Sequence, residues 1–360
     1  MSSQDRPGRR QPLIVEVEAF PAYEFLMSLC AFSDAENYAS FDIGKTWFDG
    51  VRKKASPDLL ATVEQFSFHS YEVWEHILGL VYDCPAPRDV PTFIVHIEAT
   101  DPLELRLHML GYYVRSHCRA TPPEVILQAA QGNIEAQKEM LKTSFPDDTH
   151  WQRTLRWLLS LEPAATKNLL LDIFRDWYAE VFLEQESFIM PILARDVEAK
   201  LALKLTHSTE QLIEMATGWE YVPEPGIRRV ILVPSFIMRP WNSQSEMSDT
   251  VIFCYPVAEE SISADKNAPP ARLVKLAKAL ADERRLRILK NLATGSYTLQ
   301  EMADDLGLAK TTLHHHVITL RSAGLVRMNL SDKRWSLRQY MVNNVGELLN
   351  TYLREPSQRE

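Results

Sequence analysis

The stretch LAKTTLHHHVITLRSAGLV, residues 308–326, determines how the C-terminal part of this chain folds. Its apolar residues recur every three to four positions from about Ala309 to Ala323, which predicts an amphipathic helix. Gly324 follows directly and can adopt the left-handed conformation that ends many helices. We therefore expect a helix that ends at this glycine.

A second, shorter helix is expected just before this one. Thr298 and Glu301 have the spacing of a capping box, in which each side chain bonds the other residue's backbone N–H. Gly307 can end that helix, and the small side chain of Ala303 lets two helices cross closely at a tight turn. The sequence therefore predicts a helix-turn-helix.

Two more helices and a hairpin complete the expected domain. Apolar residues in 272–280 form one helical stripe, and Asp282 can cap the helix that follows. Apolar and polar residues then alternate in 326–330 and 334–338, which predicts two strands joined by a turn. A hairpin after a helix-turn-helix is a wing, so residues 271–338 are predicted to form a winged helix-turn-helix.

This region resembles the winged helix-turn-helix of the ArsR/SmtB family of bacterial transcriptional regulators. The resemblance rests on the stretch quoted above and on ADERRLRIL, which begins at Ala281. It implies that the helix from Ala309 enters the major groove of double-stranded operator DNA, while the wing contacts the duplex beside it. The implied DNA-binding residues are Lys310, Thr311, Thr312, His314, His315, Lys333 and Arg334.

Physical chemistry gives these positions independent support. Lys310, Thr311 and Thr312 lie in the first turn of the helix, where free N–H groups and the helix dipole favour phosphate. Lys333 and Arg334 lie on a turn, where they can neutralise backbone charge or enter a minor groove. We expect the helix to supply specificity and the wing to supply affinity.

The run His314-His315-His316 does not predict a metal site. Neighbouring helical residues point about 100° apart, so three in a row cannot converge on one ion. The family's metal sensors carry a cysteine pair in the first helix of the motif, or Asp and His in the last helix. Residues 299–306 contain no cysteine, and residues 340–353 contain neither His nor Asp. We therefore predict no metal and no cofactor.

The last helix, residues 339–354, carries a second apolar stripe near the end of the chain. With the helix at 272–280 it could form a homodimer that presents two half-sites about 34 Å apart. The predicted dimerisation residues are Leu273, Leu276, Leu280, Val345, Leu348, Leu349 and Tyr352. The alternative is that this stripe packs on its own domain.

Charge divides the chain unevenly. Residues 1–270 carry a net charge of −15 and residues 271–360 a net charge of +6, which predicts an acidic body and a basic DNA-binding end. Helical periodicity dominates the body, and Val-, Ile- and Phe-rich segments near 229–257 predict a small sheet, so the fold class is mainly α. The expected order is a flexible tail at 1–12, a helical body at 13–262, a linker at 263–270, the winged helix at 271–338 and the last helix at 339–354.

The role of the body is open on sequence alone. Its tryptophans suit a pocket for a small-molecule effector or an ordinary core: Trp47, Trp74, Trp151, Trp157, Trp177, Trp219 and Trp241. A scaffold for dimerisation or protein interaction is the second hypothesis, and an enzyme fused to a DNA-binding module is the weakest.

No motif in the body names a reaction. We find no phosphate loop, no GxSxG and no HExxH, and His69 and His76 on an expected helix at 56–83 are two turns apart. Four isolated cysteines and the lack of a long apolar segment favour a cytoplasmic protein with no membrane contact. The sequence therefore predicts a regulator and not an enzyme.

Overall fold

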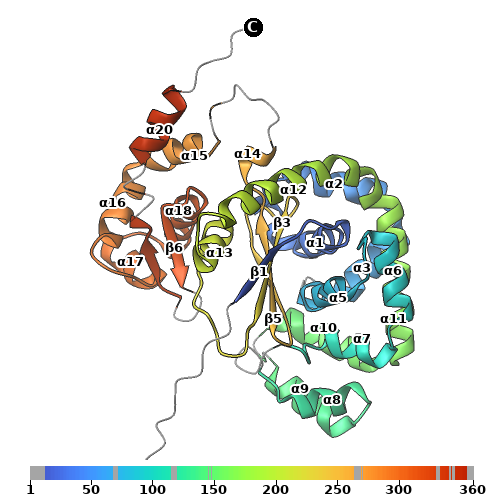
Figure 1. Cartoon of the computed structure of the whole chain (residues 1–360). Helices are drawn as coiled ribbons and strands as arrows, with labels where there is room; N and C mark the ends of the chain where they lie inside the picture. The colour runs from blue at the N-terminus through green and yellow to red at the C-terminus, as the bar shows by residue number, and fades with distance from the viewer. Residues whose placement is uncertain are drawn as a thin grey trace, which may run out of the picture. The chain divides into compact units, whose positions relative to one another are not determined.

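The computed structural model describes residues 13–67, 72–114, 120–144, 146, 148–262, 269, 271–329, 333–339, 342 and 345–354. The chain divides into two compact units, each made of two segments. The body unit comprises Met1–Met190 and Pro223–Cys254, and the winged-helix unit comprises Pro191–Val222 and Tyr255–Glu360. The structure is mainly helical with two small sheets, which confirms the predicted fold class (Figure 1).

Helices make up most of the body unit. They are α1 (Pro21–Ser33), η1 (Ala35–Ser40), α2 (Lys45–Lys54), α3 (Pro57–Ser67), α4 (Glu72–His76), α5 (Leu78–Asp83), α6 (Val90–Ala99), α7 (Pro102–Met109), α8 (Pro123–Ala130), α9 (Ile134–Thr143), α10 (Thr149–Ser160), α11 (Pro163–Trp177), the π-helical turn η2 (Tyr178–Phe182) and the first part of α12 (Leu183–Lys204). Many begin with Pro in the first turn, where its missing N–H leaves no bond unmade.

The sheet of the body unit has the strand order β1-β3-β5-β4. The strands are β1 (Ile14–Val17), β3 (Arg229–Ser235), β4 (Ser243–Met247) and β5 (Thr250–Pro256). β1 runs parallel to β3, and β4 runs antiparallel to β5. β3 and β5 are buried along almost their whole length, as strands covered on both faces are, which confirms the strands predicted near 229–257.

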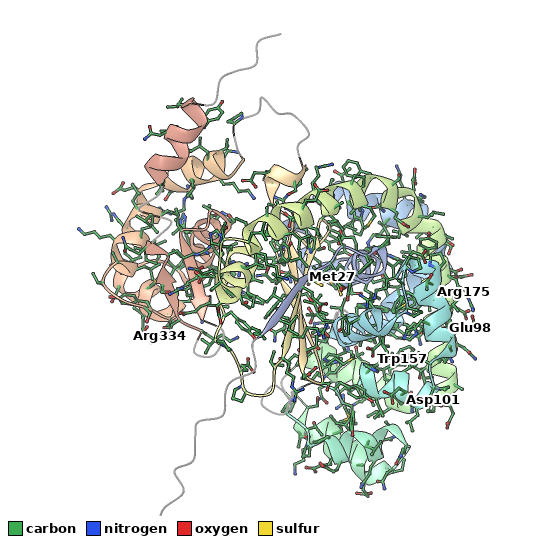
Figure 2. The ribbon with its side chains drawn as sticks, in the orientation of Figure 1. Met27, Glu98, Asp101, Trp157, Arg175 and Arg334 are labelled. Atoms are coloured by element: carbon green, nitrogen blue, oxygen red, sulfur yellow. The ribbon has the colours of Figure 1, made fainter. Side chains whose placement is uncertain are left out.

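Helix α1 is the centre of the body unit. From Ala22 to Ser33 every residue is buried, so the helix is covered on all sides and has no solvent face. It contacts β3 on the sheet and α4, α5 and α6 among the helices. Met27 lies in this core, whereas Glu98 of α6 and Arg175 of α11 form an exposed ion pair at 3.4 Å (Figure 2).

Two local predictions for the body are wrong. The expected helix at 56–83 is interrupted at Ile77, between α4 and α5, and both of these helices pack on β4. Residues 68–71, between α3 and α4, lie outside the described residues. A Cβ at Gly79 would lie 2.6 Å from Met247 Sδ, so a larger residue there would force the Met247 side chain on β4 to move. The spacing of Thr121 and Glu124 predicts a capping box, but Pro122 is the N-cap of α8 and the Thr121 hydroxyl bonds that of Thr143 at 2.9 Å.

The winged-helix unit is assembled from two distant segments. Its elements are the second part of α12, α13 (Thr209–Thr217), β2 (Trp219–Glu220), α14 (Glu259–Ile262), α15 (Ala271–Leu280), α16 (Glu283–Leu292), α17 (Leu299–Leu306), α18 (Lys310–Ser322), β6 (Val326–Asn329), β7 (Trp335–Leu337) and α20 (Val345–Arg354). A carboxylate joins the two segments: Asp196 on α12 accepts hydrogen bonds from Tyr255 Oη at 2.6 Å and Ala258 N at 2.8 Å.

The predicted domain limits differ from this division. The sequence predicts residues 191–222 in the body, yet they pack with the C-terminal segment. The predicted tail at 1–12 and, apart from Pro269, the predicted linker at 263–270 lie outside the described residues. Within the described part of the chain, no helix is both long and apolar enough to cross a membrane.

Candidate nucleic-acid interface

The helix-turn-helix forms as its capping residues predict. Thr298 Oγ1 accepts from Glu301 N at 3.3 Å, and Glu301 Oε2 accepts from Thr298 N at 2.7 Å, which confirms the capping box. Gly307 ends α17 with a φ of +63°, a conformation that costs a side-chain-bearing residue energy. The N–H of Leu308 bonds Ala303 O at 3.0 Å and closes the turn into α18.

Helix α18 has one buried face and one exposed face. Leu313, Val317 and Leu320 are fully buried in a core that includes Ile288 and Met302. The opposite face carries side chains exposed to solvent or partly so. These are the predicted DNA-binding residues Lys310, Thr311, Thr312, His314 and His315.

The N-terminus of α18 has no side-chain cap. Ala309 is its N-cap, and no side chain there accepts a hydrogen bond from the first turn. The first N–H groups of a helix lack intrahelical acceptors, and the dipole adds positive potential at this end. Together with Lys310, this helix end provides a setting that favours a phosphate or the acceptor atoms of a base edge.

The residues of the histidine run differ in burial and therefore in their role. His316 is buried against the core, and burial lowers its pKa below the usual value. His314 is exposed, and partial desolvation together with the charge of Arg321 lowers its pKa as well. Both rings are therefore neutral at pH 7, so His314 offers DNA a hydrogen bond and not a charge. Among the described residues, no group of His, Cys, Asp or Glu could hold a metal ion.

The wing is the predicted antiparallel hairpin of β6 and β7. Val326 pairs with Leu337, and Met328 pairs with Trp335, whose side chain is buried in the core. Trp335 also exchanges backbone hydrogen bonds with Tyr297, at 2.9 and 2.7 Å. This bridge joins the wing to the segment before α17.

The two basic residues at the wing turn differ in their contacts. Lys333 is exposed and has a φ of +56°. Arg334 bonds Ser296 O at 2.6 Å and Glu301 Oε2 at 3.0 Å, so its guanidinium is anchored to the start of α17. Of the predicted turn at residues 331–333, the first two lie outside the described residues.

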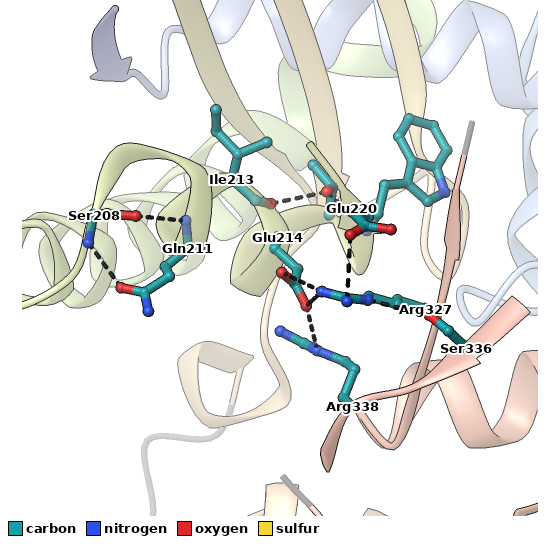
Figure 3. Close-up of polar contacts among 10 residues, drawn as sticks. Ser208, Gln211, Ile213, Glu214, Glu220, Arg327, Ser336 and Arg338 are labelled. Atoms are coloured by element: carbon teal, nitrogen blue, oxygen red, sulfur yellow. Dashed lines mark hydrogen bonds and ion pairs between the residues drawn. The ribbon is translucent and has the colours of Figure 1, made fainter. Parts of the chain in front are cut away.

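A third strand, which the sequence does not predict, extends the wing sheet. β2 pairs in parallel with β6, so the strand order is β2-β6-β7. Just before β2, Glu214 of α13 binds two arginines of the hairpin, Arg327 and Arg338 (Figure 3). Glu214 and Arg327 are 113 residues apart in sequence, so no local pattern could have indicated this contact.

The predicted dimerisation residues divide between a core and a surface. Leu276 is fully buried in its own unit, while Leu280 and Val345 are partly buried and pack on that core. Leu273 and Tyr352 are partly buried, and Leu348 lies on α20. Leu349 and Leu353 on α20 are 45% and 68% exposed, so an apolar surface remains on this helix.

The body unit contains a cavity of about 320 Å³. Apolar side chains of Leu110, Val114 and Ile126 line it together with Trp151 and His76. Burial lowers the pKa of His76, whose Nδ1 lies 3.0 Å from Met109 O, so the ring is neutral and donates this bond. The acidic residues Glu72 and Asp148 also line the cavity. His69, which the sequence places nearby, lies outside the described residues.

Comparison with known proteins supports the C-terminal assignment. Residues 282–328 match the family described as "Bacterial regulatory protein, arsR family". This range includes the whole of α16, α17 and α18. No curated protein matches this chain significantly. No solved structure matches it significantly either.

Proposed function

We propose that this chain is a cytoplasmic transcriptional regulator that binds operator DNA and catalyses no reaction. The observation that carries the proposal is the exposed face of α18 beside its uncapped N-terminus, within the segment that matches the arsR family. Lys310 and Thr311 are exposed at the end of the helix that such proteins present to the major groove. In this proposal Lys333 adds a phosphate contact from the wing.

The active form in this proposal is a homodimer. Leu349 and Leu353 leave an apolar surface on α20, and burial of such side chains in a two-fold interface would stabilise the dimer. Two copies of α18 would then face half-sites about 34 Å apart, one turn of DNA.

Control by a small molecule completes the proposal. The cavity of about 320 Å³ in the body unit is within the size range of ligand sites and combines apolar, aromatic and carboxylate groups. Such a lining suits a small molecule with an apolar part and a hydrogen-bond donor or positive charge. Binding there would shift the chain between states with different operator affinity.

DNA binding is tested with genomic fragments selected by the purified full-length chain. Lys310→Ala combined with Thr312→Ala should abolish the preference for selected over random DNA, since each base contact contributes about 1–3 kcal/mol of discrimination. Lys333→Ala should weaken binding to all sequences and reduce the salt slope by about 0.9. Lys290→Ala, a control at an exposed position of α16, should change neither the sequence preference nor the salt slope. If the helix variant and the wing variant changed the sequence preference and the salt slope equally, this would contradict the proposal.

Effector binding is tested by thermal shift of the full-length chain against a panel of metabolites. A ligand of the cavity should raise the Tm of the parent chain and leave that of Val114→Trp unchanged, because the larger side chain fills the space. A ligand that stabilises both chains equally binds elsewhere. A panel in which no compound stabilises the parent chain would favour a scaffold role for the body unit.

A further inference from the structure

The polar face of the wing hairpin carries two arginines away from the wing tip. Val326 and Met328 of β6 face the core, so Arg327 between them faces outward. On the neighbouring strand, Ser336 pairs with Arg327, and Arg338 follows two residues later on the same side. The hairpin therefore presents a second basic position, distinct from that of Lys333.

Carboxylates of a distant segment occupy this position. Arg327 Nη1 donates to both oxygens of Glu214 at 3.1 Å, and Arg338 Nε donates to Glu214 Oε1 at 3.0 Å. Glu220 on β2 lies 3.3 Å from Arg327 Nη2 (Figure 3). Two guanidinium groups thus converge on one carboxylate, a geometry in which arginine also binds phosphate.

The segment that carries Glu214 is locally well defined. Ser208 and Gln211 form a capping box at the start of α13, with bonds of 3.3 and 2.9 Å. Gly218 ends the helix with a φ of +71°, and Trp219 N then bonds Thr217 Oγ1 at 3.1 Å. These local bonds hold the helix end and β2 in one geometry, which places Glu214 against the hairpin.

The contact between this segment and the hairpin is small and partly hydrated. Within the part of the chain that the structure describes, β2 pairs with β6 through the two residues Trp219 and Glu220. The Glu214 side chain is 19% exposed and that of Arg327 is 29% exposed, so water and competing anions can reach the ion pairs. The Arg338 side chain is 12% exposed. A phosphate carries the same sign of charge and offers similar acceptor oxygens, so it can replace the carboxylate without leaving the guanidinium groups unpaired.

We propose that Arg327 and Arg338 form a phosphate-binding position of the winged-helix unit, and that Glu214 occupies it when DNA is absent. A backbone phosphate of the duplex is the competing ligand. Release of Glu214 opens the position and adds phosphate contacts to those of Lys333, so the α13–β2 segment lowers DNA affinity until it is displaced. This proposal rests on the proposed DNA-binding function.

The test compares Glu214→Gln with the parent full-length chain on selected genomic DNA at 50 to 200 mM salt. The amide removes the charge that Arg327 and Arg338 share and leaves only Glu220 against Arg327, so affinity at low salt should rise. Each recruited phosphate should increase the salt slope by about 0.9, an additional loss of about three- to fourfold over this range. Glu210→Gln removes the same charge from the same helix, where the carboxylate accepts from Ser208 Oγ at 3.0 Å, and should leave the slope unchanged.

Further variants separate the possible outcomes. Arg338→Ala in the Glu214→Gln background should abolish the gain in affinity and slope. If Glu214→Gln does not fold, Glu214→Asp keeps the charge but draws it back from the arginines, and it should give a smaller gain. Unchanged or weaker binding by a folded Glu214 variant, while Lys310 remains essential, would overturn this proposal alone. Loss of all salt-dependent DNA binding by the parent chain would instead refute the proposed function.

Discussion

Substitution of Asp196 by alanine should destabilise the winged-helix unit strongly. Its carboxylate is fully buried and accepts from Tyr255 Oη at 2.6 Å, Ala258 N at 2.8 Å and Ser261 Oγ at 3.1 Å. Lys200 Nζ lies 3.2 Å from it and is itself almost buried. The residue therefore joins α12 to the segment that leads into the winged helix.

The magnitude follows from the groups that would be left behind. Asp196→Ala leaves the Lys200 ammonium buried without its carboxylate, and loss of one partner of a buried ion pair costs about 3–5 kcal/mol. Some of the charge remains stabilised by the Tyr255 ring, whose centroid lies 5.2 Å from Lys200 Nζ. We therefore expect a loss of about 3–4 kcal/mol in the free energy of unfolding.

Urea denaturation of the full-length chain, followed by hydrogen exchange of residues 191–204 and 255–262, measures this loss. Glu198→Ala, at an exposed position of the same helix, should change stability by less than about 0.5 kcal/mol. Asp196→Ala with Lys200→Met should recover at least about 1 kcal/mol, because the uncompensated charge is gone. A single-variant loss below about 1 kcal/mol would refute the reasoning, since it would mean that water reaches the carboxylate.

Three other predictions concern individual residues. Burial raises the pKa of Glu24 from 4.5 to about 7, so this carboxyl should destabilise the body unit as the pH rises from 4.5 to 7. Over that range the free energy of unfolding of Glu24→Gln, measured by urea titration, should rise by about 3 kcal/mol relative to that of the parent chain. A difference between the two chains that does not change with pH would contradict this. Ala303→Leu should lower the free energy of unfolding by about 1–3 kcal/mol, because the larger side chain overpacks the buried contact between α17 and α18. Thermal denaturation measures this loss, and an unchanged Tm would exclude close packing at this contact. Gly307→Ala should lower the free energy of unfolding by about 1 kcal/mol. The φ of +63° alone causes this loss, because nothing lies within 4 Å of an added Cβ. An unchanged Tm in the same assay would show that the turn relaxes.

The parts of the winged helix that the sequence predicts have local causes. Asp282 caps α16 through the N–H of Arg285 at 3.0 Å, and Thr298 caps α17 in the same way. Gly307 and the alternation in the hairpin also act through near neighbours in the chain. Such signals lie within a few residues of one another, so they are visible without knowledge of the fold.

Predictions failed where distant packing outweighed local periodicity. The stripe at 56–83 has helical spacing throughout, yet packing on β4 divides it. The sequence of β4, SQSEM, is polar and gives no strand signal. The segment is nevertheless a mostly buried strand, because it pairs with β5. The sequence predicts Leu276 at a dimer surface, but the core of its own unit buries it completely.

The candidate DNA-binding face shows the same division. The sequence indicates Lys310, Thr311 and His314 because residues on one exposed helical face follow from spacing alone. It does not indicate that Arg327 and Arg338 are occupied by Glu214, since side chains more than a hundred residues apart meet only when the chain folds. Local backbone preferences thus determine the winged helix itself, whereas long-range packing and charge pairing decide which of its basic groups are open to a partner.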